Sequence, residues 1–91
     1  MIRFEWKREQ WGRFGVRWAL LRDGKEVGCC FYQPGSKRYQ VCVTAACAHG
    51  VRLLDYYGGT ASAARRALER DWCRRSIGLF GEDDIDFVEI A

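Results

Sequence analysis

The chain has 91 residues, of which 48% are hydrophobic and 30% are charged, with a single proline. That length accommodates one domain, spanning residues 1–91, and that composition excludes a disordered or collagen-like chain. No apolar run reaches the roughly 18 residues that a membrane-spanning helix needs. Residues 1–7 lack the apolar stretch of a secretory signal, so we expect a cytoplasmic protein.

Charge is distributed unevenly along the chain. Fifteen Lys and Arg residues stand against twelve Asp and Glu, which gives a net charge of +3. Residues 82–91 hold five acids and no base, so residues 1–81 carry fifteen bases and seven acids, a charge of +8. Two interpretations stay open. The acidic segment neutralises arginines of the same molecule, or one of these surfaces meets a charged partner.

Alternation of apolar and polar residues predicts strands in the first half of the chain. Residues 2–7 have this period, and so do residues 14–21 and 25–32, which flank the strong hairpin signal Asp23-Gly24. This turn pairs Arg22 with Lys25. Counting back from it, we expect three apolar pairs of opposite residues, Leu20 with Val27, Trp18 with Cys29 and Val16 with Phe31. We expect this face of the hairpin to be buried under a helix.

The second half of the chain predicts two further strands, one helix and a last strand. Residues 39–47 and 51–57 are rich in β-branched and aromatic side chains, and residues 85–90 resemble them. Thr60 is a good N-cap for an amphipathic helix over roughly residues 61–76, with Gly78 as its C-cap. We therefore expect an α+β fold in the order β-β-β-β-α-β, in which one amphipathic helix packs on one face of an antiparallel sheet of four to five strands.

The cysteines and the one histidine do not form a catalytic or metal-binding pattern. The five cysteines, Cys29, Cys30, Cys42, Cys47 and Cys73, are odd in number and contain no C-x₂-C pair. We therefore expect free, mostly buried thiols, no metal and no cofactor. His49 precedes Gly50, where a turn is expected. With no nucleophile beside a base and no glycine-rich phosphate loop, we expect no enzyme activity.

Charged and aromatic residues form the candidate partner-binding sites. Arg66, Arg70 and Arg74 are four residues apart on the expected helix, and guanidinium groups in a row suit phosphate or carboxylate recognition. Trp11 and Arg13 lie in a loop and have the composition of an interaction hot spot. The plain alternatives are a solvated helix face and a tryptophan folded over the edge of the sheet. Two further candidates are the acidic segment Glu82, Asp83 and Asp84, and the polar sheet face with Arg3, Lys7, Arg17 and Tyr32.

Two resemblances suggest a function. Residues 11–15 (WGRFG) resemble the W-G-R-V-G signature of WGR domains, which contact DNA ends; in that family two strands usually precede the signature, whereas one precedes it here. The chain as a whole, with its IRFEW start, its Asp23-Gly24 hairpin and its tryptophan-containing helix, resembles short phage and prophage proteins, anti-CRISPR proteins among them. The helix residues that carry this likeness are Thr60, Ala64, Ala67, Leu68, Glu69 and Trp72.

The second resemblance implies a non-catalytic protein, monomeric or homodimeric, that occupies a surface of a host protein or ribonucleoprotein complex. The acidic segment would imitate nucleic-acid phosphates there, or the arginines would meet an acidic patch. The alternative is a direct nucleic-acid-binding module that uses the arginine-rich helix or the basic sheet face.

Overall fold

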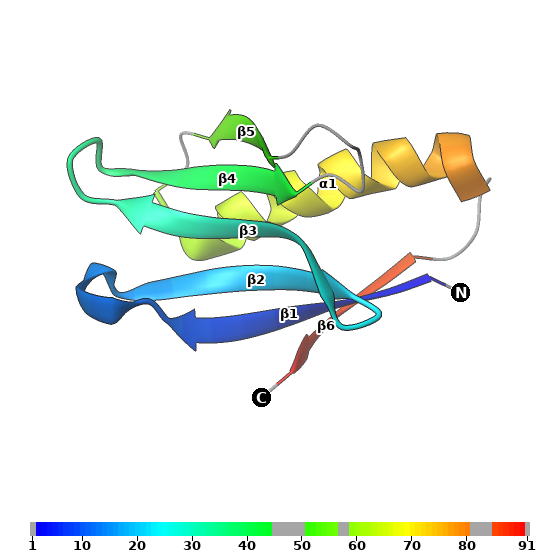
Figure 1. Cartoon of the computed structure of the whole chain (residues 1–91). Coiled ribbons are helices and arrows are strands. Elements are labelled where there is room, and N and C mark those ends of the chain that lie inside the picture. The colour runs from blue at the N-terminus through cyan, green and yellow to red at the C-terminus, as the bar shows by residue number, and fades with distance from the viewer. Residues whose placement is uncertain (1, 45–50, 57–58, 81–84, 91) are drawn as a thin grey trace.

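The computed structural model describes residues 2–44, 51–56, 59–80 and 85–90. These residues form six strands, one long helix and one turn of 3₁₀ helix (Figure 1). In chain order the elements are β1 (Ile2–Gln10), η1 (Gly12–Phe14), β2 (Val16–Arg22), β3 (Lys25–Gln33), β4 (Arg38–Thr44), β5 (Val51–Tyr56), α1 (Ala61–Phe80) and β6 (Ile85–Ile90).

All six strands belong to one sheet, in the order β5-β4-β3-β2-β1-β6. Strands β1 to β5 pair antiparallel with their neighbours, whereas β6 pairs parallel with β1, Ile2 lying opposite Ile85. The predicted α+β class is confirmed, and the sheet is mostly antiparallel, with the parallel pairing of β6 as the departure from the expected antiparallel sheet. The sheet has six strands instead of four or five, because all six segments for which the sequence predicts a strand join the same sheet. Helix α1 carries the chain from the β5 edge to the β6 edge.

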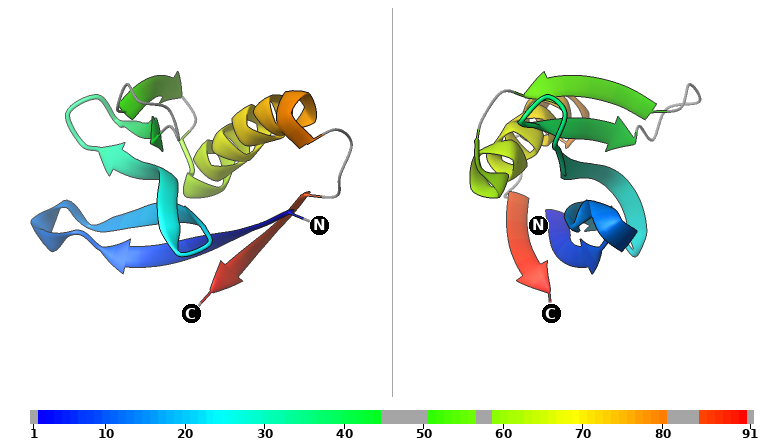
Figure 2. Two further views of the ribbon diagram at one scale, coloured as in Figure 1. Left: turned by 45° about the vertical axis from the view of Figure 1, so that its right-hand side comes forward. Right: turned by 90° about the vertical axis from the view of Figure 1, so that its left-hand side faces the viewer.

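The core lies between α1 and one face of the sheet (Figure 2). We call this the core face and the opposite one the outer face. On α1 the buried residues recur at spacings of four, as the predicted apolar stripe requires. The buried members of the core are Phe4, Trp6, Leu20, Cys30, Val41, Val43, Ala64, Leu68 and Trp72.

The Asp23-Gly24 turn forms as predicted, but the register beyond it was predicted wrongly. Arg22 lies opposite Lys25, and both turn residues have positive φ, as a two-residue hairpin turn requires. A β-bulge then inserts one extra residue in β3, so Leu20 lies opposite Gly28, and Trp18 opposite Cys30.

The bulge exchanges the faces of the residues that follow it in β3. Cys30 instead of Cys29 packs in the core beside Leu20 and Trp18. Cys29 and Phe31, expected under the helix, lie on the outer face, where Phe31 is opposite Arg17. A shift of one residue moves every side chain to the other side of a sheet.

Helix α1 begins where the sequence predicts and ends later. The backbone N–H of Ala63 donates a hydrogen bond to Thr60 Oγ1 at 3.2 Å, which is the expected N-cap. The helix continues to Phe80, beyond the expected end near residue 76 and through Gly78. A single glycine costs a helix only about 1 kcal/mol relative to alanine, so it does not end a helix by itself.

Candidate partner-binding surfaces

Three arginines form an exposed charged surface on α1. Arg66, Arg70 and Arg74 are all exposed, because the opposite side of the helix, with Leu68 and Trp72, packs on the sheet. We call these three residues the arginine face. Their spacing of four residues places them in one row along the helix axis.

The arginine face has little neutralising charge within the described part of the chain. Arg74 lies 4.0 Å from the carboxylate of Asp71 one turn back, and its own side chain is 79% exposed. No described carboxylate forms an ion pair with Arg66 or Arg70. Like charges four residues apart on a helix repel by a few tenths of a kcal/mol. An anionic partner would relieve this repulsion.

Hydroxyl groups lie beside two of these arginines at the start of α1. A hollow of about 330 Å³ is lined by Thr60, Ser62, Ala63, Arg66 and Arg70. A second hollow of about 220 Å³ shares Ser62 and Arg66 and continues toward β6, where Phe87 and Glu89 line it. The exposed cations therefore border a concave, polar surface and not a flat one.

Arg65, which the sequence reasoning did not single out, faces inward. Its guanidinium carbon lies 4.1 Å from the ring centroid of Trp18 and 5.8 Å from that of Trp6. Its Nη1 donates to Glu89 of β6 at 2.5 Å. Glu89, one of the five C-terminal acids, thus neutralises an arginine of the helix. Residue 65 lies four positions after Ala61 and three before Leu68. The helical spacing in the sequence therefore already places it on the side of the helix that faces the sheet.

The predicted acidic segment, Glu82, Asp83 and Asp84, lies outside the described residues. Asp86, at the start of β6, is described and exposed. The hypothesis that residues 82–84 bind a partner therefore stays a prediction.

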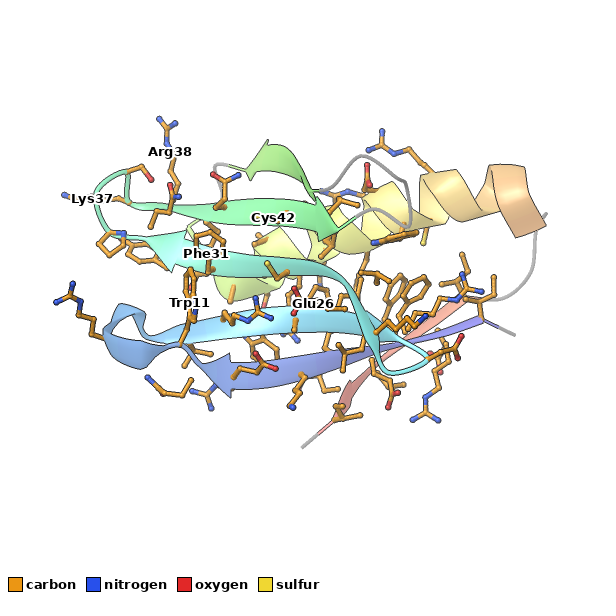
Figure 3. All side chains as sticks on the ribbon, viewed as in Figure 1. Trp11, Glu26, Phe31, Lys37, Arg38 and Cys42 are labelled. Atoms are coloured by element: carbon orange, nitrogen blue, oxygen red, sulfur yellow. The ribbon has the colours of Figure 1, made fainter. Side chains whose placement is uncertain are left out.

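Arg13 lies in the 3₁₀ turn η1, which joins β1 to β2, and Trp11 directly precedes this turn. The backbone N–H of Trp11 donates to the Gly15 carbonyl at 2.6 Å, and Gly12 and Gly15 have positive φ. The indole contacts Phe31 edge-on, with 4.7 Å between ring centroids, and stays 39% exposed. Arg13 is exposed. Figure 3 shows Trp11 and Phe31 on the outer face, with α1 behind the sheet.

The two groups of predicted site residues do not form one surface. The arginine face belongs to the helix that covers the core face, whereas Trp11 packs on Phe31 on the outer face. A single small partner would contact one group or the other. Two partner surfaces, or one partner that wraps around an edge of the sheet, would be needed to contact both.

The predicted basic sheet face is neutralised within the chain. Arg17 forms ion pairs with Glu9 on β1, at 3.0 Å, and with Glu26 on β3. Lys7 lies 3.7 Å from the carboxylate of Glu9. Burial opposes the charge on Arg17, but the hydrogen bonds from its guanidinium to Glu9 and Glu26 outweigh this effect and raise its pKa.

The remaining members of that expected patch do not form one cationic surface with Arg17. Arg3 lies 4.0 Å from the carboxylate of Glu5. Tyr32 is on the core-face side of β3, where its ring contacts that of Tyr39 at 5.4 Å. The bulge in β3 explains this correction, because it places Phe31 and not Tyr32 beside Arg17.

Two cysteines lie beside Arg17 on the outer face. Cys29 of β3 is directly opposite Cys42 of β4, and each is 7% exposed. Both are free thiols, as are Cys30 and Cys73. Cys47 and His49 fall outside the described residues. Among the residues that are described, no three His, Cys, Asp or Glu side chains come close enough together to hold a metal ion.

Comparison of the chain with protein-family models, curated protein sequences and solved structures gives no match. Within the described ranges, no helix combines the length and apolar character needed to cross a lipid bilayer. The surfaces above are therefore interpreted from their own geometry and charge.

Proposed function

We propose that this protein is a small non-catalytic binding protein that occupies a surface of a nucleic-acid-targeting complex and inhibits it, as anti-CRISPR proteins of phages and mobile elements do. One observation carries the proposal. Arg66 and Arg70 are exposed and form no ion pair with a described carboxylate, whereas Arg17 and Arg65 are both paired with acids of the same chain.

The chemistry of the arginine face defines the partner. Guanidinium groups bind carboxylates and phosphates through paired N–H donors, and exposed arginines retain this capacity in full. The hydroxyls of Thr60 and Ser62 beside Arg66 and Arg70 add short polar groups to the same concave surface. A complex that holds nucleic acid exposes both phosphates and the acidic side chains that arginines recognise.

Charge reversal of the arginine face tests the proposal. The variant Arg66→Glu/Arg70→Glu should fold with nearly unchanged Tm, because both side chains are exposed. It should lose binding to a CRISPR effector ribonucleoprotein and lose inhibition of target cleavage. The control is Arg8→Glu/Lys25→Glu, which changes the net charge equally at two exposed cations of the sheet. Equal loss in both variants, or retained inhibition in the first, contradicts the proposal.

The acidic segment requires its own arm of the experiment. If Asp83 and Asp84 only neutralise the helix, the change Asp83→Lys/Asp84→Lys should lower Tm, and combining it with Arg70→Glu/Arg74→Glu should restore much of the loss. If they imitate phosphates, inhibition should fall while Tm stays nearly constant. Trp11→Ala tests the outer face in the same assays.

Direct binding to nucleic acid is the second candidate, because an exposed row of arginines also fits a phosphate backbone. Its signature is binding of free DNA or RNA with an affinity that falls steeply as salt rises. An inhibitor that occupies a protein surface should bind the effector complex but not free nucleic acid. The sheet face contributes little to direct binding, because Arg17 and Lys7 are already paired with acids.

A further inference from the structure

The outer face of the sheet contains a pair of thiols placed for bond formation. Cys29 and Cys42 are directly opposite each other on the antiparallel strands β3 and β4. Directly opposite residues have Cα atoms about 4.5–5.5 Å apart. This separation falls within the roughly 4.4–6.8 Å that a disulfide spans. We propose that Cys29 and Cys42 form an oxidisable dithiol that hydrogen peroxide converts into a disulfide joining β3 to β4.

The electrostatic surroundings favour Cys42 as the reacting thiolate. A hydrogen bond from the Cys29 thiol lowers the pKa of Cys42, with a smaller contribution from the Arg17 guanidinium in the same direction. Burial, the neighbouring Cys30 and the Glu26 carboxylate oppose this shift. The same hydrogen bond, together with burial, raises the pKa of Cys29. The same contact thus lowers the pKa of Cys42 and raises that of Cys29.

The reaction balances with peroxide as the only oxidant. The Cys42 thiolate attacks one peroxide oxygen and the O–O bond breaks. The leaving hydroxide takes the proton that the Cys42 thiol released on ionisation and becomes water. Cys42 is then a sulfenic acid. The Cys29 sulfur attacks the Cys42 sulfur, the S–O bond breaks, and hydroxide leaves with the Cys29 proton as a second water. Two thiols are oxidised to one disulfide, and one peroxide is reduced to two waters.

The fold separates this pair from its neighbour Cys30. Cys30 is adjacent in sequence but fully buried on the core face, where burial raises its pKa to about 12. Cys29 and Cys42 keep 7% exposure. That exposure suits a small oxidant such as peroxide, while a bulky disulfide such as that of glutathione has poor access. The opposite orientation of Cys30 therefore keeps it out of the disulfide, and the small exposure of the pair restricts which oxidants reach it.

Mass spectrometry of the reduced full-length chain tests the proposal. Titration with hydrogen peroxide should remove two hydrogen masses and lower the free thiol count from five to three. Tryptic digestion should then give a cross-link between peptides 26–37 and 39–52. Because these peptides also contain Cys30 and Cys47, fragment ions must assign the bond to Cys29 and Cys42.

Matched variants complete the test. Cys29→Ser and Cys42→Ser should each abolish the cross-link, whereas Cys73→Ser should form it at the wild-type rate. A variant that retains only Cys29 and Cys42 should also form it. If any variant fails to fold, the fragment ions from the wild-type chain still decide. A bond that involves Cys30 or Cys47, stable sulfinic acid at Cys42 without a cross-link, or five unreacted thiols would overturn the proposal.

Discussion

Gly28 of β3 lies so close to Leu68 of α1 that an added side chain at position 28 would collide with it. A Cβ atom at position 28 would lie 2.9 Å from Leu68 Cδ2 and 3.0 Å from the carbonyl oxygen of Cys42. Separations this short require a neighbouring atom to move. The bulge in β3 therefore places the single glycine of this strand opposite Leu20, where the helix packs against the sheet.

We expect Gly28→Ala to destabilise the protein by about 1–3 kcal/mol through overpacking. Leu68→Ala should cost about 2–5 kcal/mol alone, because it leaves a cavity in the core. In the double variant the cost of Gly28→Ala should shrink without vanishing, since the Cys42 carbonyl still obstructs the new methyl group. Urea denaturation measures all three. Gly35→Ala, whose Cβ meets nothing within 4 Å, is the neutral control.

The Arg65 guanidinium should stabilise the fold more through Trp18 than through Glu89. We expect Arg65→Lys to cost about 1 kcal/mol, because an ammonium group stacks less well on an indole. Glu89→Gln should cost less than about 0.5 kcal/mol, because the Glu89 side chain is 60% exposed. Thermal denaturation compares the two, with Arg66→Lys as the exposed control. A larger loss from Glu89→Gln would assign the stabilisation to the ion pair.

The ion pair of Glu9 with Arg17 predicts a loss of stability in acid. A hydrogen bond from Arg17 lowers the pKa of Glu9 below its ordinary 4.5, against a weaker effect of burial. A lowered folded-state pKa stabilises the fold above pH 4.5 and stops doing so as the pH falls through the folded value. We expect Glu9→Gln to cost about 0.5 kcal/mol near neutral pH. Tm values down to strongly acidic pH should show the gap closing, and a constant gap would contradict this account.

Thr60 should determine how well α1 begins. Thr60→Ala removes the acceptor of the Ala63 N–H and should cost about 1 kcal/mol. Thr60→Ser keeps a hydroxyl in the same place and should retain most of the stability. Ser62→Ala is the control, because Ser62 lies two residues after Thr60 and is exposed. It should change the free energy of unfolding by less than about 0.5 kcal/mol. Equal losses from the alanine and serine changes would argue against the cap.

Features that depend on neighbouring residues in the chain can be predicted from local sequence patterns. The Asp23-Gly24 turn, the Thr60 cap and the spacing of Leu68 and Trp72 predict local structure that the fold retains. The exposure of Arg66, Arg70 and Arg74 follows from the same helical period, since residues opposite a buried stripe face solvent. These patterns also sufficed for the α+β class.

Features that depend on contacts between distant segments follow from the packing of the folded chain. The bulge in β3 matches Gly28 to Leu68, 40 positions further along the chain, and no local pattern reveals that fit. The bulge in turn placed Cys29 beside Cys42 and sent Cys30 to the core. The parallel pairing of β6 with β1 brought Glu89 to Arg65 in the same way. Alternation specifies two faces for a strand, but packing across the sheet selects which face meets the helix.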